Sequence, residues 1–381
     1  MKVRLFKPSV GQDELNAVAG AIDRAWLGLG MKVAEFERRW AEYIGSPHAV
    51  GVNSGTAALH LAVTACGLPK GSKVLVPAMT FVSTAAAVLY NGLEPVFVDC
   101  DSETMGLDLD DAERKVTDDC GAIMVVHMYG HPAPMDRVMA FAARHGLKVI
   151  EDCAHCTGGS YQGQKLGTFG DFGCFSFEEK KCMTSGDGGM LVFKDGAHAE
   201  PLKAMRWVGI DKDTWKRNEA YTDVRLEARH WYYEIALLGY KYNMNDLAAS
   251  IGLVQLDKLD AMNAARTRGI RRYMDGLSSA SRVRPIIPFI TDGSAAYWIF
   301  GLRTGDRDDL MRYLKGHEIS TGLHYTPLTR HPLMAPYASP VPNCDAVYEQ
   351  IMTLPLFADI TDEEIDYVIA HVLAWDEVGA Q

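Results

Sequence analysis

Residues 122–152 read AIMVVHMYGHPAPMDRVMAFAARHGLKVIED, and this stretch decides the fold class. Two apolar runs, 122–127 and 148–152, flank residues 136–145, in which apolar side chains recur at helical spacing. Strand, helix and strand in this order predict a β-α-β unit with two parallel strands. Similar apolar runs lie on both sides of this unit, at residues 72–81, 95–99, 174–177 and 190–193.

Strands of this kind predict an α/β fold in which helices cover both faces of a mostly parallel sheet. Ligands of such sheets bind at the carboxyl ends of the strands. After about residue 245 the pattern changes to a periodic helix at 246–262, followed by helices with a few short strands. We expect a large domain at residues 1–255, which includes the N-terminal arm, and a smaller C-terminal α+β domain at residues 256–381. A long helix would bridge the two.

Composition excludes several classes of protein. The 381 residues include 38 Lys and Arg against 49 Asp and Glu, a net charge of -11 that disfavours nucleic-acid binding. A local basic pocket for one small anion remains open. The N-terminal residues MKVRLFKPSV lack an apolar signal core, and no run reaches the ~20 apolar residues of a membrane span. We therefore expect a cytoplasmic protein that binds neither nucleic acid nor membrane.

The eight cysteines do not form a disulfide framework in a chain of this length, which agrees with a reducing compartment. Cys153 and Cys156 form a C-x-x-C pair, a spacing used by redox and zinc sites. A redox pair usually opens a helix, and a structural zinc needs a second such pair, which the sequence lacks. We interpret the two as small residues packed behind a loop and expect no metal site.

Small residues at 53–58, NSGTAA, precede a helical run at 59–66. Free backbone N–H groups and the helix dipole at such a start favour an anion, above all a phosphate, near Gly55 and Thr56. A simple helix cap is the alternative. Neither a Walker A loop nor a dinucleotide-binding glycine motif is present.

Two further features carry charge. Asp152 ends a buried strand, where its carboxylate must be solvated or paired. Lys180 and Lys181 follow the strand at 174–177 and precede a glycine-rich turn at 186–189, although they could also be a solvated pair.

A helix start that suits a phosphate, a carboxylate at a strand end and a lysine together match the groups that pyridoxal 5′-phosphate (PLP) needs in its binding site. Gly55 and Thr56 would hold the phosphate, Asp152 would keep the ring nitrogen protonated, and Lys181 would form a Schiff base with the aldehyde. Phe81 could stack on the ring, unless it is a core residue.

The sequence resembles the DegT/DnrJ/EryC1/StrS family of sugar aminotransferases, which are fold-type I PLP-dependent transferases. The resemblance covers essentially the whole chain, and the matching sequence segments occur in the same order as in the family. The segments are WLGLG at 26–30, FE at 36–37, NSGTAALHLA at 53–62, VPAMTFVSTA at 76–85, PVFVD at 95–99, IEDCAH at 150–155, GTFGDFGCFSF at 167–177, TSGDGG at 184–189, GYKYNMNDLAASIGLVQL at 239–256, HYTPL at 324–328 and LPLFADITDEEIDYVI at 354–369.

The resemblance implies specific roles for residues. By position, the family's Schiff-base lysine is Lys181, five residues after the serine of CFSF and five before the first glycine of TSGDGG. Dehydratases of the family place histidine there, so the lysine favours transamination. Asp152 matches the partner of the ring nitrogen, and His155 matches a site beside the cofactor's phenolic oxygen. The remaining matches are Ser176 with Gly55 and Thr56 as phosphate contacts, Phe81 as the stacking aromatic, and Met31, His324 and Tyr325 as substrate contacts.

The sequence departs from the family in two places. GYKYNM at 239–244 replaces the common GYNYRM, a segment that in relatives reaches the phosphate of the neighbouring subunit. Either Lys241 or Asn243 could make this contact. Glu178, Glu179 and Lys180 stand where the family tends to have histidine, proline and a small residue; they could tune substrate choice or form a solvated turn.

The resemblance implies a homodimeric PLP-dependent aminotransferase with shared active sites. Its amino donor would be glutamate or glutamine, and its acceptor a keto-deoxysugar linked to a nucleotide. A transaminase acting on a cyclitol or another non-nucleotide ketone, a PLP-dependent sugar dehydratase and a non-enzymatic scaffold are the alternatives.

Overall fold

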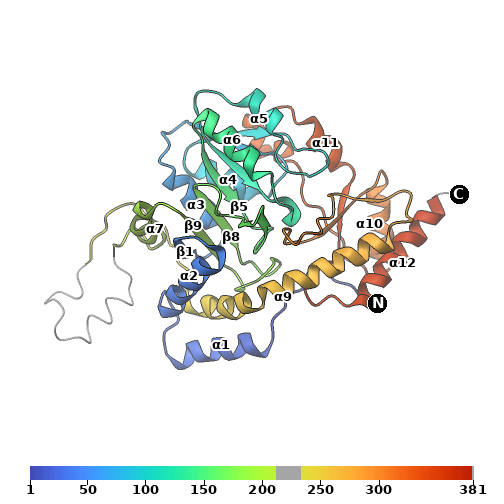
Figure 1. Cartoon of the computed structure of the whole chain (residues 1–381), viewed down its shortest axis with the longest axis horizontal. Coiled ribbons are helices and arrows are strands. Elements are labelled where there is room, and N and C mark those ends of the chain that lie inside the picture. Colours follow the sequence, from blue (N-terminus) through green and yellow to red (C-terminus); the bar gives the residue numbers. More distant parts are fainter. Residues whose placement is uncertain (212–232, 380–381) are drawn as a thin grey trace.

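The computed structural model describes residues 1–211 and 233–379 (Figure 1). Its centre is a seven-stranded sheet with the order β1-β9-β8-β5-β4-β2-β3. Strand β9 runs antiparallel to its neighbours β1 and β8, and the other pairs are parallel, which confirms the expected α/β fold. The strands are β1 His48–Val52, β2 Lys73–Pro77, β3 Glu94–Val98, β4 Cys120–Val126, β5 Lys148–Asp152, β8 Phe172–Ser176 and β9 Gly189–Phe193.

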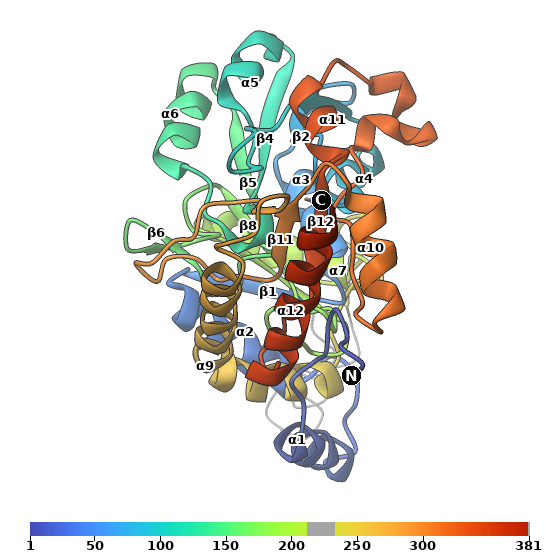
Figure 2. The same ribbon diagram turned by 90° about the vertical axis from the view of Figure 1, so that its right-hand side faces the viewer.

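Helices cover both faces of this sheet. In Figure 2, α5 and α6 lie on one side of β4 and β5, and α4 lies on the other. The helices before the C-terminal part are α1 Gln12–Asp23, α2 Met31–Ile44, α3 Gly55–Ala65, α4 Val82–Tyr90, α5 Leu109–Lys115, α6 Met135–His145 and α7 Ala199–Arg206. A two-stranded sheet, β6 Ser160–Tyr161 and β7 Gln164–Lys165, follows β5.

Helix α9, Asp246–Gly276, is the long bridging helix that the sequence predicts (Figure 1). It packs against α1 and α2 at one end of the molecule and against α12 at the other. The C-terminal part contains a three-stranded antiparallel sheet of β10 Arg284–Pro285, β11 Phe300–Arg303 and β12 Ile351–Leu354, with α10 Arg307–Gly316, α11 Pro342–Tyr348 and α12 Asp362–Gly379. A capping box precedes α12, because Thr361 and Glu364 each accept the backbone N–H of the other.

The residues that the structure describes form two hydrophobic cores. One lies around the central sheet, and the other joins α10, α12 and the small sheet to Val3 of the N-terminal arm. Leu328, Val341 and Val347 belong to the first core although they lie late in the chain. The division at residues 255 and 256 falls within α9.

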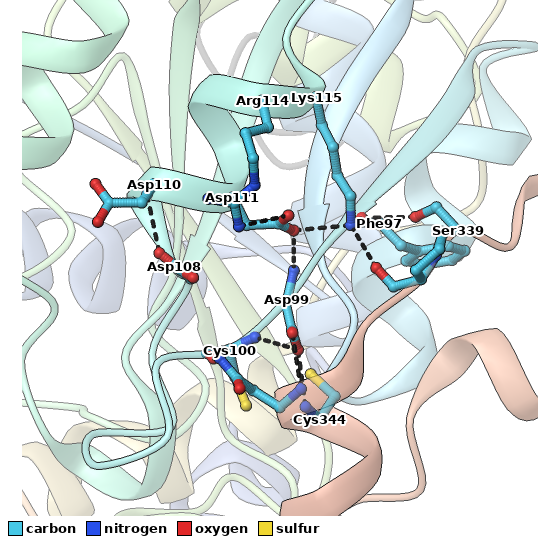
Figure 3. Close-up of polar contacts among 12 residues, drawn as sticks. Phe97, Asp99, Cys100, Asp108, Asp110, Asp111, Arg114, Lys115, Ser339 and Cys344 are labelled. Atoms are coloured by element: carbon cyan, nitrogen blue, oxygen red, sulfur yellow. Dashed lines mark hydrogen bonds and ion pairs between the residues drawn. The ribbon is translucent and has the colours of Figure 1, made fainter.

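Asp99 ties α11 to the edge of the central sheet (Figure 3). Its buried carboxylate accepts the backbone N–H groups of Asn343 and Cys344 at 2.8 and 2.7 Å. Lys115 adds a second link, since its ammonium donates to the carbonyl of Pro340 at 2.9 Å. These contacts place the turn before α11 beside β3, close to the carboxyl ends of the strands.

Local chemistry explains where the predicted elements shift. Strand β2 ends at Pro77 rather than residue 81, because Phe81 is the N-cap of α4. The helix predicted at 246–262 continues to Gly276, and the one predicted at 59–66 begins at Gly55. Strand β1 was not predicted; it is a short edge strand. No helix of the described residues is long and apolar enough to cross a membrane.

Candidate active site

A pocket of about 400 Å³ opens at the carboxyl ends of the central strands, where ligand sites of α/β sheets are expected. Several of the residues that surround it were expected from the sequence. Those that line it are Gly55, Thr56, Phe81, Asp152, His155, Ser176, Lys181, His324 and Tyr325. The structure therefore brings residues from distant parts of the chain to one cavity.

The start of α3 forms an anion seat in this pocket. Ser54 caps the helix by accepting the N–H of Ala57 at 3.1 Å, and the first backbone amides of a helix have no partner within it. A Cβ atom at Gly55 would lie 2.8 Å from that of Ser176, so glycine permits the close approach of α3 to β8. The Thr56 hydroxyl lies 2.7 Å from that of Ser83. Hydroxyl groups and a helix dipole thus converge on one point, which suits a phosphate.

Asp152 is a buried carboxylate at the end of β5. Thr84 donates its hydroxyl to Asp152 at 3.0 Å, and the N–H of Ala154 donates at 3.1 Å. Burial raises the pKa of Asp152 above its ordinary value, although these hydrogen bonds and the charge of Lys181 oppose the shift. Among the described residues no cationic side chain forms an ion pair with it. A cationic ring nitrogen at this place would supply the missing partner.

Lys181 and Lys180 have different surroundings. The Lys181 ammonium lies 3.9 Å from the centre of the Trp298 ring, and burial lowers its pKa to about 8 against the attraction of Asp152. Lys180 is exposed, and its ammonium lies 3.6 Å from a carboxylate oxygen of Glu178. The lower pKa makes Lys181 the better nucleophile and proton carrier at neutral pH.

His155 is held between aromatic residues of the C-terminal part. Its ring stacks on Trp298 with centroids 4.1 Å apart, and its Nε2 lies 3.0 Å from the Tyr325 hydroxyl. Burial and the charge of Lys181 hold the pKa of His155 well below its ordinary value, so the ring is neutral. Its buried Nδ1 has no hydrogen-bond partner among the described residues, which leaves this atom for a ligand.

Two other predicted residues also line the pocket. Phe81 is 52% exposed, and its ring centroid lies 5.8 Å from that of Tyr325. It is therefore available for stacking rather than part of the core. Burial, followed by the charges of Lys181 and Lys180, lowers the pKa of His324 to about 4. His324 is thus neutral at physiological pH.

Three predicted residues do not line the pocket. Met31 is 57% exposed at the start of α2. The Lys241 ammonium lies 3.3 Å from the centre of the Trp207 ring, and the Asn243 amide donates to the Met244 carbonyl. The backbone of this segment nevertheless runs beside the end of β1, since the carbonyl of Tyr242 accepts the N–H of Asn53 at 2.7 Å.

Sequence reasoning missed Trp298 and Thr84. Trp298 comes from the C-terminal part, and its indole N–H donates to the carbonyl of Lys180 at 2.6 Å. No sequence pattern near Trp298 predicted this contact, because it forms only when the C-terminal part packs on the turn that carries Lys180. Thr84 lies in the first turn of α4, and its hydroxyl is 2.9 Å from that of Thr80, which precedes the N-cap Phe81. The sequence pattern did not mark this contact.

The pair Cys153 and Cys156 lies buried next to His127. His127 Nδ1 accepts the N–H of Ala133 at 3.1 Å, and its Nε2 lies 3.2 Å from Glu151. Both ring nitrogens thus have a polar partner, and the ligand atoms of the three side chains lie within 4.8 Å of one another. The expectation of two small residues packed behind a loop stays a prediction.

The family model of DegT/DnrJ/EryC1/StrS aminotransferases matches residues 8–373. The chain belongs to this family. Spore coat polysaccharide biosynthesis protein SpsC of Bacillus subtilis is 34% identical over 377 residues, which cover 96% of this chain and 95% of SpsC. The crystal structure of sugar aminotransferase CalS13 from Micromonospora echinospora has a TM-score of 0.88 at 29% identity, with 98% of this chain and 99% of that one covered. The PLP-form of Spr1654 from Streptococcus pneumoniae has a TM-score of 0.90 at 26% identity, with 99% of each chain covered.

This DegT/DnrJ/EryC1/StrS aminotransferase chain has residues that fit PLP. The helix start at Gly55 and Thr56 suits a phosphate, and no cationic side chain in the described part of the chain pairs with buried Asp152. Lys181 offers an amine with a lowered pKa, and His155 offers an unpartnered buried nitrogen. These four features surround one cavity.

Proposed function

We propose that this chain is a PLP-dependent aminotransferase that transfers an amino group to a keto-sugar. The observation that carries the proposal is the convergence of Lys181, Asp152 and the start of α3 on one pocket. Family membership and the likeness to CalS13 support it.

Each residue has a defined task in this proposal. Bound PLP supplies an aldehyde that links to amines and a ring that withdraws electrons from the reacting carbon. Lys181 would hold the aldehyde of the cofactor and would act as proton carrier in both directions, for which a pKa of about 8 is well placed. Asp152 keeps the ring nitrogen protonated, and the hydroxyl of Thr84 orients Asp152.

The side chains around His155 complete the site. Neutral His155 would bind the phenolic oxygen through Nδ1 while Tyr325 holds its other nitrogen. Phe81 would stack on the ring, and the amides of Gly55 and Thr56 with Ser176 would fix the phosphate. His324 and Tyr325 would contact the substrate; the role assigned to Met31 would require the partner subunit.

The assignments of the amino donor, the acceptor and the oligomeric state follow from the family resemblance of the sequence. We propose glutamate, with glutamine as the alternative, as the amino donor, and a nucleotide-linked keto-deoxysugar as the acceptor. The enzyme would act as a homodimer, as the family resemblance implies. Its mechanism would be ping-pong, because donor and acceptor use the same pocket in turn.

Absorbance spectra test the proposal. Purified protein with PLP should lose its long-wavelength visible band when glutamate is added, and a suitable ketone should restore it. A panel of nucleotide keto-sugars and free cyclitol ketones then identifies the acceptor class. Restoration by cyclitol ketones alone would select the cyclitol alternative, and loss of water from a hydroxylated sugar would select the dehydratase. A spectrum that no amine changes would contradict the proposed function.

A further inference from the structure

One pocket must accept two chemically different substrates if the proposed function is correct. The donor is an amino acid with at least one carboxylate, whereas the reacting part of the acceptor is an uncharged ring with hydroxyl groups. A cation near the pocket would favour the donor, but a permanently unpaired cation would also attract unrelated anions. A cation that pairs with a protein carboxylate while the donor is absent, and with the donor when it binds, would meet both requirements.

Lys180 is placed to act as such a cation. Of the described residues that line the pocket, only Lys180 and Lys181 are lysine or arginine, and Lys181 is needed for the cofactor and for proton transfer. The backbone of Lys180 is fixed on both sides. Its N–H donates to Glu178 at 3.0 Å, and its carbonyl accepts the indole N–H of Trp298 at 2.6 Å.

The ammonium of Lys180 is held only loosely. It lies 3.6 Å from a carboxylate oxygen of Glu178, and the two side chains are 49% and 36% exposed. An exposed ion pair of this length contributes little stability, so an incoming carboxylate can replace Glu178 at small cost.

Two further residues show how charge is arranged around this pair. Burial, followed by the positive charges of Lys181 and Lys180, lowers the pKa of His324, which also lines the pocket. Burial, followed by the negative charge of Glu178, raises the pKa of Asp187, which also lines the pocket. The pocket lining therefore carries the carboxylates of Glu178 and Asp187 in addition to Lys180.

We propose that Lys180 binds a carboxylate of the amino donor and that Glu178 holds Lys180 while the donor is absent. During the donor half-reaction the ammonium turns from Glu178 to the donor. During the acceptor half-reaction it returns to Glu178, and the pair presents no net charge to the ring. Lys180 and Glu178 thus set the choice of substrate without taking part in bond making.

The test follows the decay of the visible band against glutamate concentration in rapid-mixing experiments. Lys180→Gln should raise the half-saturating glutamate concentration about tenfold, the factor that one hydrogen bond to a charged group commonly contributes. Its limiting rate should stay near that of the wild type. Glu178→Gln should lower the half-saturating concentration, because Lys180 loses its competing partner.

Lys148→Gln is the matched control. Lys148 is also half-exposed and also paired, 2.8 Å from Asp171, but it lies at the opposite end of β5. This variant should behave as the wild type does. The half-reaction of Lys180→Gln with an uncharged ketone should also be unchanged.

The outcomes separate this inference from the proposed function on which it rests. A wild-type response to glutamate that Lys180→Gln leaves unchanged would overturn the role of Lys180 alone. If Lys180→Gln slows both half-reactions equally, Lys180 only supports the turn that carries Lys181. A wild type that responds to no amino acid would overturn the proposed function and this inference with it.

Discussion

Lys180 and Lys181 are adjacent in sequence, yet only Lys181 has the surroundings that a covalent cofactor lysine needs. Its ammonium contacts Trp298, and burial lowers its pKa, whereas Lys180 pairs with Glu178. We expect Lys181→Ala to abolish turnover and the visible band of covalently attached PLP. Lys180→Ala should keep the band, as absorbance spectra will show. The opposite result would mean that the assignment is off by one residue.

The pKa of Lys181 predicts how cofactor attachment depends on pH. Only the neutral amine attacks an aldehyde, and a pKa of about 8 leaves half of the amine neutral at pH 8. At pH 6 the neutral fraction is about one in a hundred. The rate at which PLP attaches to the apoprotein should therefore rise with pH up to about 8 and level off above it. A rate that still rises steeply between pH 9 and 10 would show an ordinary lysine pKa.

Asp152 should act on catalysis rather than on cofactor attachment. Breaking a buried charge pair costs about 3 kcal/mol or more, which corresponds to about a hundredfold in rate. Asp152→Asn should slow both half-reactions by at least this factor while the visible band still forms. Rapid-mixing measurements with donor and acceptor will show whether both steps slow. Near-normal turnover would remove Asp152 from the mechanism.

At the scale of residues, sequence reasoning named those whose roles depend on local pattern. Asp152 could be named because it ends an apolar strand, whereas the choice of Lys181 over Lys180 came from the family resemblance, which sets the spacing to Ser176 and Gly186. The contacts of Trp298 could not be predicted, because they depend on how the C-terminal part packs on the turn after β8. Met31 was named but lies outside the pocket of its own chain.

At the scale of elements, the strands and helices with strong periodicity were predicted, and those that depend on neighbours were not. Strands β4 and β5 and helix α6 follow from their apolar pattern. Strand β1 is a five-residue edge strand with Gly51 inside it, and its pairing with β9 depends on residues far along the chain. The position of α11 is likewise invisible in sequence, because Asp99 sets it across more than 240 residues.

The contact of Asp99 with α11 predicts a stability effect. The carboxylate accepts three backbone N–H groups, those of Cys100, Asn343 and Cys344, and its loss would leave buried donors unpaired (Figure 3). Asp99→Ala should lower the free energy of unfolding by about 3 kcal/mol, measured by urea or thermal unfolding. Asp110→Ala is the control, because Asp110 is exposed and the change should stay within about 0.5 kcal/mol. Equal stabilities of the two variants would contradict the anchoring role.

At the scale of the whole molecule, the pocket lies where the two parts of the chain meet. The central sheet and α3 provide Gly55 and Asp152, and the C-terminal part provides Trp298, His324 and Tyr325. The general position of the site followed from the sequence, since ligands bind at the carboxyl ends of parallel strands. Its closure by the C-terminal part followed only from the family resemblance.

The placement of Lys241 and Asn243 bears on whether two chains share each active site. Neither lines the pocket of its own chain, although their segment runs beside Asn53 near the start of α3. The family resemblance implies that this segment contacts a second pocket across a dimer interface, and this stays a prediction. PLP that touches both chains should then also stabilise the dimer, because binding favours the associated state.

Mixed dimers give the decisive measurement of this sharing. Subunits with Lys181→Ala should be combined with subunits that carry Lys241→Ala and Asn243→Ala, each parent being inactive or nearly so. If the segment serves the neighbouring site, one of the two sites in each heterodimer has both elements intact, and random mixing should restore activity well above either parent. If the segment serves its own chain, every site in the heterodimer lacks one element. Heterodimers demonstrated by differential tagging that show no recovery would therefore place Lys181 and the 239–244 segment in the same chain's site.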